Sequence, residues 1–171
     1  MLSKCHIKLR LKHALLVGLM VIVSGQAIAA SSTQAAPDFT LKSRSGENIK
    51  LSELRGQVVM INFWASWCGP CRQEMPLLEQ LYKRYQSMGF TLLGVNVDED
   101  HTAADKMLGN VSVSFPILFD DQSQVSKQYQ VKAMPSTFMV DRDGQVRHLH
   151  KGYKPGYEED YQQQIRALLR E

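Results

Sequence analysis

The sequence predicts an α/β domain in which helices flank a central mixed sheet. Two observations lead to this prediction. Short apolar runs rich in β-branched residues alternate with segments of helical periodicity, which is the pattern of a layered α/β fold. The runs at 58–63 and 90–97 are largely apolar, as expected for strands that are buried on both faces. The 171 residues, 44% of them hydrophobic and 22% charged, suffice for one globular domain.

The N-terminal segment has the three parts of a secretory signal peptide. A basic head without acidic residues precedes the apolar run 14–23, and the small-residue pattern Ala27-Ile28-Ala29 follows it. We therefore predict a signal peptide over residues 1–29, with an uncleaved N-terminal membrane anchor as the alternative. Either arrangement places a domain over residues 37–171 in the periplasm or another extracytoplasmic compartment, after a flexible lead-in at 30–36.

The charge of the mature chain gives no reason to expect nucleic acid as a partner. The whole chain has a formal charge of +3, but the predicted leader holds four of the 20 basic residues and none of the 17 acidic ones. Removal of the leader thus leaves one net negative charge, and the remaining basic residues form no clustered stripe.

A β-hairpin and a strand–helix unit come first in the predicted domain. Residues 39–41 and 48–51 flank the turn-rich segment 43–46, which predicts a small hairpin. The first buried strand then leads into a helix over 70–85, whose apolar side chains recur at helical spacing along one side. Gly89 marks the end of this unit.

Shorter elements alternate through the rest of the chain. Asp143-Gly144 is a strong hairpin signal, so the strands on either side of it are expected to pair. The final segment is amphipathic, as expected for a helix that packs on the domain with one face. The predicted elements are a helix at 102–108, a strand at 115–119, a helix at 123–129, strands at 136–140 and 146–150, and a helix at 157–169.

The segment Cys68-Gly69-Pro70-Cys71 gives the strongest chemical signal. It lies between the first buried strand and the helix, so Cys68 precedes the first helical turn, where unpaired N–H groups and the helix dipole stabilise a thiolate. Pro70 suits this turn because its missing N–H would have no helical partner. A pair with this spacing and place indicates dithiol–disulfide exchange. We expect Cys68 to form the mixed disulfide with a substrate and Cys71 to resolve it.

A structural or metal-binding role is the alternative interpretation of the pair. Removal of the leader takes Cys5 away and leaves two cysteines, which close too short a loop to stabilise a fold appreciably. A zinc site would need four ligands, and no second cysteine pair follows, so we expect no resident metal. Two thiolates suit Cu(I), with Met134 as a candidate third ligand. A copper-binding or copper-delivery module is therefore the second function that the sequence leaves open.

Longer motifs around the pair resemble the thioredoxin superfamily. Residues 63–71, with the sequence FWASWCGPC, resemble its active-site segment. The motifs at 36–39, 95–98 and 134–138 extend the resemblance to the exported TlpA/ResA branch, over residues 36–170. This resemblance implies a thioredoxin-like fold with an N-terminal β-hairpin extension and an extra helix–strand insertion. It also implies no cofactor besides the redox-active cysteine pair.

The resemblance implies further site residues. Pro135 matches a cis proline that faces the redox disulfide Cys68–Cys71 and exposes backbone for strand-like pairing with a substrate. Trp67 is expected to shield the disulfide and contact partners, and Trp64 to lie in the core. The expected substrate-binding residues are Trp67, Gly69, Pro70, Met134 and Pro135.

Glu74 is the expected proton carrier. Cytoplasmic thioredoxins have a buried aspartate six residues before the first cysteine, whereas this chain has Asn62, which does not titrate. Glu74 follows Cys71 by three residues and so lies near the same helical face. The exported branch has a glutamate at the matching position that is implicated in its redox chemistry. A partly buried carboxyl beside a thiol would exchange protons with it; the alternative is a glutamate that faces solvent.

Two other groups of residues are interpreted as structural. His148 and His150 share one face of a predicted strand, which we expect to be exposed rather than metal-binding. The segment Asp98-Glu99-Asp100 lacks the full ligand spacing of a calcium loop and is expected to be a solvated strand-end loop.

The resemblance implies an enzyme that acts as an exported disulfide reductase. Its expected substrates are protein cysteines, for example those of cytochrome c before haem attachment, and its electrons would come from a membrane thiol–disulfide carrier. The Gly69-Pro70 dipeptide, which reducing thioredoxins share, agrees with this direction. We expect a monomer. A disulfide-forming oxidant is the related alternative, while a peroxidase is disfavoured because the reactive cysteine of peroxide-reducing relatives lies in a different local sequence.

Overall fold

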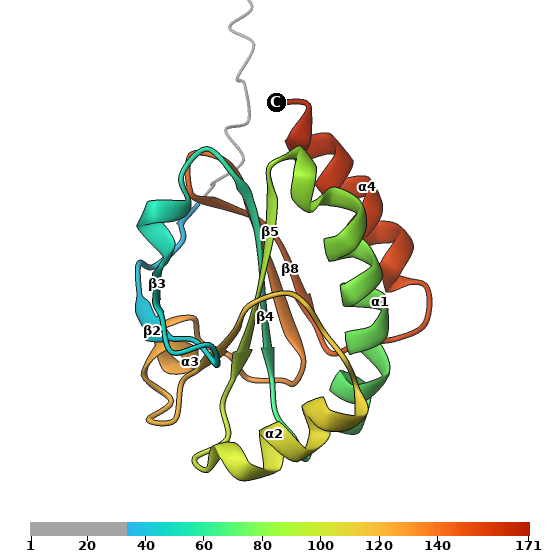
Figure 1. The fold of residues 1–171 in the computed structure, drawn as a ribbon. Coiled ribbons are helices and arrows are strands. Elements are labelled where there is room, and N and C mark those ends of the chain that lie inside the picture. The colour runs from blue at the N-terminus through green and yellow to red at the C-terminus, as the bar shows by residue number, and fades with distance from the viewer. Residues whose placement is uncertain (1–33) are drawn as a thin grey trace, which may run out of the picture. The chain divides into compact units, whose positions relative to one another are not determined.

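A six-stranded mixed sheet lies at the centre of residues 34–171, the part of the chain that the computed structural model describes (Figure 1). Its strand order is β1-β8-β7-β4-β5-β6, in which β5 runs parallel to β4 and β6 and the other neighbours are antiparallel. A second sheet is the hairpin β2–β3. The strands are β1 (Gln34–Ala35), β2 (Thr40–Lys42), β3 (Asn48–Lys50), β4 (Val58–Trp64), β5 (Phe90–Asn96), β6 (Ile117–Phe119), β7 (Ser136–Val140) and β8 (Gln145–Lys151).

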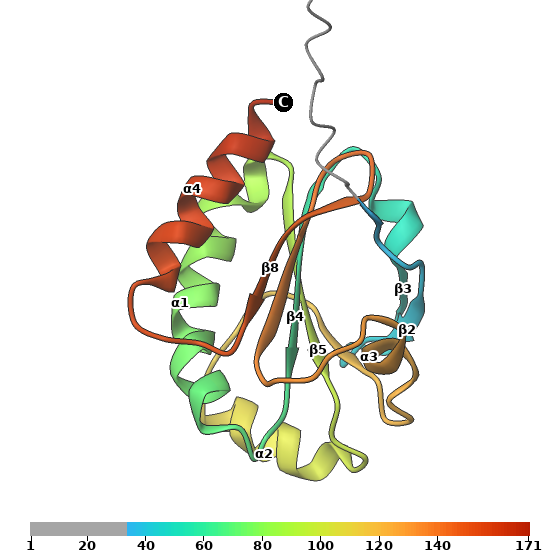
Figure 2. The same ribbon diagram turned by 180° about the vertical axis from the view of Figure 1, so that it is seen from behind.

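Both faces of the central sheet are covered. Helices α1 and α4 pack against one face, and the β2–β3 hairpin and α3 lie on the other (Figures 1 and 2). Side chains of β4 alternate between the faces, so Trp64 belongs to the apolar cluster under α1 and α4, whereas Phe63 belongs to the opposite cluster. The helices are α1 (Gly69–Tyr85), α2 (His101–Asn110), α3 (Gln124–Gln128) and α4 (Tyr157–Leu169), with short 3₁₀ segments at Leu51–Leu54 and Gln86–Met88.

The predicted fold class and the order of its elements are confirmed. The hairpin extension is β2–β3, and the extra helix–strand insertion is α2 and β6. All seven residues of β4 are buried, as its apolar run predicts. The strand predicted at 115–119 is shorter, since β6 begins only at Ile117; the preceding Pro116 has no N–H to donate to a ladder.

The flexible lead-in predicted at 30–36 is wrong at its C-terminal end. Gln34–Ala35 form β1, which pairs with β8, and the buried Ala36 donates its N–H to the Gly144 carbonyl at 2.9 Å. The physical reason is that the edge of β8 has backbone groups in need of partners, and small side chains let the incoming chain reach them. The predicted signal peptide at 1–29 and the start of the lead-in lie outside the described residues.

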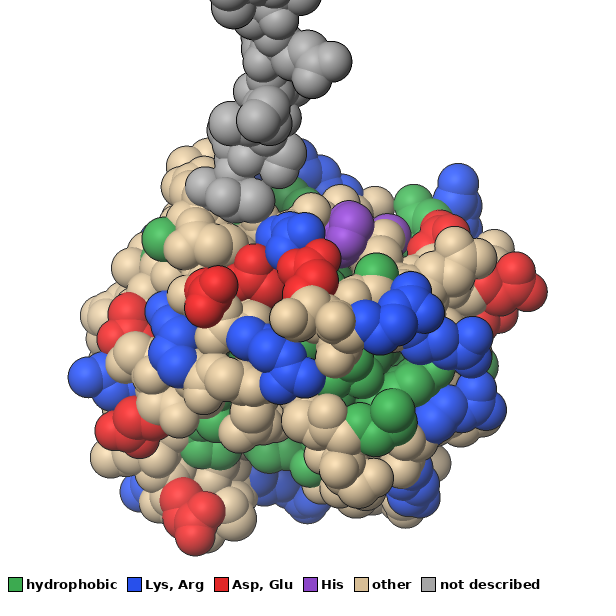
Figure 3. Space-filling model, turned by 90° about the horizontal axis from the view of Figure 1, so that it is seen from above, with side chains coloured by type: hydrophobic (Ala, Val, Ile, Leu, Met, Phe, Trp, Pro, Cys, Tyr) green, Lys and Arg blue, Asp and Glu red, His purple; other side chains and the backbone are tan. Residues whose placement is uncertain are grey.

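Acidic and basic side chains are interspersed at the end of the domain where α4 ends (Figure 3). Arg147 of β8 makes ion pairs with Asp141 and Glu171. Such pairs at the surface contribute about 0–1 kcal/mol each, so they adjust this surface rather than hold the fold. Within residues 34–171, no helix combines the length and the apolar character that crossing a membrane requires.

Candidate active site

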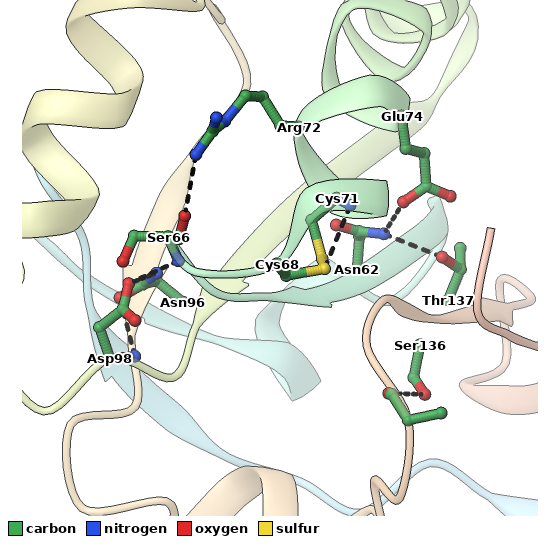
Figure 4. Close-up of a disulfide and its surroundings, with 11 residues drawn as sticks. Asn62, Ser66, Cys68, Cys71, Arg72, Glu74, Asn96, Asp98, Ser136 and Thr137 are labelled. Atoms are coloured by element: carbon green, nitrogen blue, oxygen red, sulfur yellow. Dashed lines mark hydrogen bonds between the residues drawn. A yellow bond between two sulfur atoms is a disulfide. The ribbon is translucent and has the colours of Figure 1, made fainter.

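A disulfide between Cys68 and Cys71 lies at the N-terminus of α1 (Figure 4). Cys68 is the N-cap residue, and its sulfur accepts the backbone N–H of Cys71 at 3.1 Å. Gly69 and Pro70 begin the helix, and both are exposed. The predicted place of the pair, ahead of the first helical turn, is confirmed. Both cysteines are well covered, since Cys68 is 4% and Cys71 1% exposed.

A buried carboxylate fixes the turn before the disulfide. Asp98, which follows β5, accepts hydrogen bonds from the Ser66 N–H at 2.9 Å and from Asn96 Nδ2 at 2.8 Å (Figure 4). Arg72 donates to the Ser66 carbonyl from the other side, at 3.3 Å. The expected solvated loop is therefore wrong at Asp98, because backbone and amide donors satisfy this carboxylate away from water.

An open groove of about 560 Å³ runs beside the disulfide. We call it the active-site groove; it is lined by Trp67, Cys68, Gly69, Pro70, Val131, Lys132, Ala133 and Met134. The Met134–Pro135 bond is cis, as the resemblance implies, and Pro135 itself is buried. Trp67 is 71% exposed and Trp64 fully buried, in agreement with their expected places. A bulky aromatic side chain thus stands in solvent next to the disulfide.

A buried polar network lies beside the disulfide, on the side where α1 meets the sheet. Glu74 is only 1% exposed, so the solvent-facing alternative is excluded. Its carboxyl accepts hydrogen bonds from Asn62 Nδ2 of β4 at 2.9 Å and from the Tyr161 hydroxyl of α4 at 2.7 Å. The same Asn62 amide donates to Thr137 Oγ1 of β7 at 2.9 Å, and Figure 4 shows the Glu74 carboxyl pointing toward both residues. Three elements therefore hold one carboxyl beside the cysteine pair.

Comparison with known families agrees with this geometry. The sequence model of the Redoxin family matches residues 31–165, most of the chain. This chain belongs to the Redoxin family. The cysteine pair, the cis proline and the layered sheet described above are all inside the matched region.

Individual relatives of this Redoxin-family protein are thiol–disulfide oxidoreductases. Thiol-disulfide oxidoreductase ResA of Geobacillus kaustophilus (strain HTA426) is 40% identical over 126 residues, which are 74% of this chain and 71% of the relative. ResA of Geobacillus thermodenitrificans (strain NG80-2) is 38% identical over 142 residues, 83% of this chain and 79% of the relative. The Redoxin-family protein is accordingly a ResA-like thiol–disulfide oxidoreductase with Cys68–Cys71 as its disulfide.

Solved structures show the same thioredoxin-like fold. A putative thiol:disulfide interchange protein DsbE from Chlorobium tepidum has a TM-score of 0.77 and 42% identity, covering 80% of this chain and 96% of that one. A putative protein disulfide isomerase from Bacteroides thetaiotaomicron has a TM-score of 0.76 and 31% identity, covering 81% and 90%.

Sequence reasoning missed two partners of Glu74 and misplaced a histidine. Thr137 and Tyr161 contribute to the network around the carboxyl, although neither lies near the cysteines in the sequence. A signal for Tyr161 exists in its position on the buried stripe of α4, where a hydroxyl needs a partner. The strand face of His150, expected to be exposed, is instead half-covered by α4: its ring meets that of Tyr161 edge to face at 4.8 Å.

Within the described part of the chain, metal-binding side chains do not gather near the disulfide. Residues 34–171 contain no group of three or more His, Cys, Asp or Glu placed to hold an ion. Met134 lines the same groove as Cys68, so a Cu(I) ion bound by the two thiolates of the reduced pair could take the thioether of Met134 as a third ligand.

Burial raises the pKa of Glu74 from its usual value near 4.5 to about 7, even though hydrogen bonds from Tyr161, Asn62 and Thr137 favour the charged form. The physical cause is the loss of water around the charge, which outweighs the three donors. At neutral pH the carboxyl is thus close to half-ionised, the condition in which a group both accepts and returns protons readily.

The raised pKa predicts how Glu74→Gln changes stability with pH. Below about pH 4.5 the carboxyl is protonated in both states, and between about pH 4.5 and 7 mainly the unfolded chain ionises, so the native state loses stability as pH rises. Relative to the variant, the oxidised wild-type protein should therefore lose up to about 3 kcal/mol of unfolding free energy between pH 4 and pH 8. Urea unfolding over this pH range measures the difference.

Glu79→Gln is the matched control on the same helix. Burial raises the pKa of Glu79, but hydrogen bonds from Ser114 and Lys83 outweigh this effect, and the net shift is downward. Its charge thus stabilises the fold above the unfolded pKa, and the difference from wild type should stay constant from about pH 5 to pH 8. Parallel pH curves for the wild type and Glu74→Gln would contradict the buried, proton-binding Glu74.

Proposed function

We propose that this Redoxin-family protein reduces disulfides in protein substrates outside the cytoplasm. The observation that carries the proposal is the buried Glu74 carboxyl one helical turn beyond Cys71, beside a nearly buried cysteine pair. The direction of electron flow depends on whether the surroundings favour thiolates, because an oxidant is strong when its reduced form is stabilised.

Two opposing effects act on the thiolates. The helix N-terminus favours a negative sulfur at Cys68 by about 0.3–2 kcal/mol. Burial and a neighbouring carboxylate both oppose the thiolate. Full burial shifts the pKa of an ionisable group by up to about 3–5 units, and each unit corresponds to about 1.4 kcal/mol. Because the opposing effects are larger, the reduced form gains little stabilisation from a thiolate, in contrast to the reduced form of a strong oxidant. This argument supports a reductant.

The exchange proceeds in two steps. The Cys68 thiolate attacks one sulfur of the substrate disulfide, which forms a mixed disulfide and releases the first substrate thiolate. The Cys71 sulfur, after losing its proton, then attacks the Cys68 sulfur and releases the second substrate thiolate. Two electrons pass to the substrate, and the Cys68–Cys71 disulfide remains. We propose that Glu74 accepts the Cys71 proton, since its pKa of about 7 matches the working range.

The active-site groove suits an extended polypeptide. Its two walls come from the start of α1 and from the segment that ends at the cis Met134–Pro135 bond, so a chain lying between them would pass over Cys68. We propose that Trp67, Gly69 and Pro70 contact the substrate from one wall, and that Met134 contacts it from the other. Pro135 would act by setting the backbone direction there, because it is buried.

The compartment and the electron donor follow from the predicted leader. We propose that residues 1–29 direct export, or anchor the chain, and that residues 37–171 act as a monomeric domain. A reductase in an oxidising compartment needs a supply of electrons, so a membrane thiol–disulfide carrier would re-reduce the Cys68–Cys71 disulfide. Oxidised cysteines of a cytochrome c precursor are the proposed example of a substrate.

The reduction potential is expected to lie near or below the value of about −270 mV that is typical of a thioredoxin. The physical reason is that the reduced form lacks the thiolate stabilisation that raises the potential of a strong oxidant. Equilibration of the purified protein with dithiothreitol redox buffers at pH 7, followed by quantification of free thiols, measures it. A potential near the roughly −120 mV of strong oxidants would reverse the proposed direction.

Cys71→Ser should trap a substrate as a stable mixed disulfide, because the resolving sulfur is gone. A suitable probe is an oxidised Cys-x-x-Cys-His peptide, which has the pattern of a c-type haem attachment site. Mass spectrometry of reduced Cys71→Ser mixed with this peptide should show a one-to-one adduct. Cys68→Ser is the matched control and should form little adduct, since Cys68 lines the active-site groove and Cys71 does not; equal trapping by both variants would refute the assigned order of attack.

Copper delivery is the second candidate, and the observation that favours it is that Met134, which carries a thioether, lines the same groove as Cys68. The two functions are separated by titrating the reduced protein with Cu(I) under anaerobic conditions. Tight stoichiometric binding that weakens in Met134→Leu, together with no turnover on disulfides, would favour copper delivery over the reductase.

A further inference from the structure

A row of polar side chains crosses the sheet face that α1 and α4 cover. Asn62 of β4 stands directly opposite Thr137 of β7, and Thr137 stands opposite His150 of β8. Directly paired residues on neighbouring strands point to the same face of a sheet. This row therefore runs under the two helices, inside a layer whose other members are mainly apolar, such as Met60 and Met139. Such a row needs polar partners from the helices.

Tyr161 of α4 supplies one of these partners. It is 1% exposed, and its hydroxyl donates to Glu74 Oε1 at 2.7 Å. The ring of His150 packs against the ring of Tyr161 edge to face at 4.8 Å, and His150 Nε2 is 3.0 Å from Gln164 Oε1 on the same helix. The tyrosine ring is thus held by the end of the polar row, with its hydroxyl directed at Glu74.

We propose that Tyr161 is a positioning residue for disulfide exchange, whose hydroxyl holds the Glu74 carboxyl beside Cys71 and favours its ionised, proton-accepting form. This inference rests on the proposed role of Glu74 as the proton acceptor. It adds that a residue of α4, the last helix, controls the protonation of Glu74 and thereby its capacity to accept a proton.

The strength of this hydrogen bond follows from its surroundings. A neutral donor that meets a carboxylate in a dry site stabilises the charge more than it would in water. Tyr161 is the largest of the contributions that oppose the rise of the Glu74 pKa caused by burial, ahead of Asn62 and Thr137. Burial and the nearby Glu74 charge in turn raise the pKa of Tyr161 well above its ordinary value. The tyrosine therefore remains a donor across the working pH range.

Other titratable groups surround the carboxyl but act less directly. Cys71 shares its helix, and Tyr153 comes from the segment after β8 and interacts with Glu74 through charge. Tyr157 of α4 and His150 of β8 contact the Tyr161 ring. Of these side chains, Tyr161 is the one whose hydroxyl donates a hydrogen bond to Glu74.

Tyr161→Phe should shift the titration of Glu74 upward by about one pH unit. The ring and its packing on His150 are kept, and the lost donor corresponds to one hydrogen bond to a charged group, about 1.4 kcal/mol per pH unit. The midpoint is measured in the oxidised protein by the NMR shift of the Glu74 side-chain carbon. In the reduced protein, the pH–rate profile of exchange should contain one step from Glu74 and one from the thiol. The midpoint of the Glu74 step should move by the same amount.

Tyr85→Phe is the matched control. Tyr85 is also a buried tyrosine of the α1–α4 interface, and its hydroxyl accepts a hydrogen bond from Arg166 of α4 at 2.8 Å, near the opposite end of α1. Its removal should lower the stability without moving the Glu74 titration. If the role of Tyr161 were merely structural, Tyr161→Phe would behave like Tyr85→Phe, with lower stability and an unchanged Glu74 titration.

The outcomes separate this inference from the proposed function. A Glu74 titration in Tyr161→Phe that coincides with wild type would overturn the role of Tyr161 and leave the reductase intact. An exchange profile of Glu74→Gln that coincides with wild type would instead remove Glu74 from the mechanism, while the NMR titration of the oxidised protein would still decide what Tyr161 does to the carboxyl. If Tyr161→Phe does not fold, the wild-type Tyr161 ring resonances provide the test: they should shift with the Glu74 midpoint, and their failure to do so would contradict the proposal.

Discussion

The Glu74 carboxyl is withdrawn from water where α1 crosses the sheet, and the rest of the site is arranged around this constraint. A buried carboxyl must be protonated, or surrounded by donors, or both. Here burial favours the protonated form, and the donors Asn62 and Tyr161 favour the charged form, which leaves the group near balance at neutral pH. These donors stand 12 and 87 residues away in the sequence, so the balance exists only when β4, α1 and α4 are all in place.

The disulfide separates two different environments. On one side is the active-site groove, with the exposed Trp67 and the cis Met134–Pro135 bond. On the other side is the closed polar network of Glu74. A substrate that enters the groove meets Cys68 first, while Cys71 lies toward the network, at 1% exposure. Nucleophile and resolving thiol thus differ in their surroundings although only two residues stand between them, and this difference gives the exchange its order.

Local patterns predict the elements, but only part of the site. The apolar run of β4, the Asp143-Gly144 turn and the helical spacing after Pro70 are short-range features, and the structure has strands, a hairpin and α1 where they predict them. The Cys68–Cys71 spacing is local as well. The cis form of Pro135 came from the family resemblance, because a trans proline satisfies the same local sequence.

The remaining features depend on contacts that one segment of sequence does not reveal. Tyr161 fits an apolar stripe on α4, and only the packing of α4 against α1 turns its hydroxyl toward Glu74. The sequence predicts that Asp98 is solvated like its acidic neighbours, whereas in the fold it accepts hydrogen bonds from Ser66 and Asn96. From sequence alone, the segment before Ala36 is predicted to be flexible, because its pairing partner β8 is more distant in the sequence than any local pattern reveals. In each case a polar side chain or backbone group has a hydrogen-bond partner that is distant in sequence. The group is buried in the fold because that partner satisfies it there.

The alkylation rate of Cys68 against pH tests the central claim that the charge of Glu74 governs the thiol chemistry. The fully reduced protein and its Glu74→Gln variant are reacted with iodoacetamide between about pH 5 and pH 10, a range that contains the Glu74 pKa of about 7 and the ordinary thiol pKa of about 8.5. A negative charge beside a thiol opposes thiolate formation. The midpoint of the variant should therefore lie at lower pH than that of the wild type, with a flatter rise above neutrality. Superimposable curves would show that Glu74 does not act on the cysteine pair.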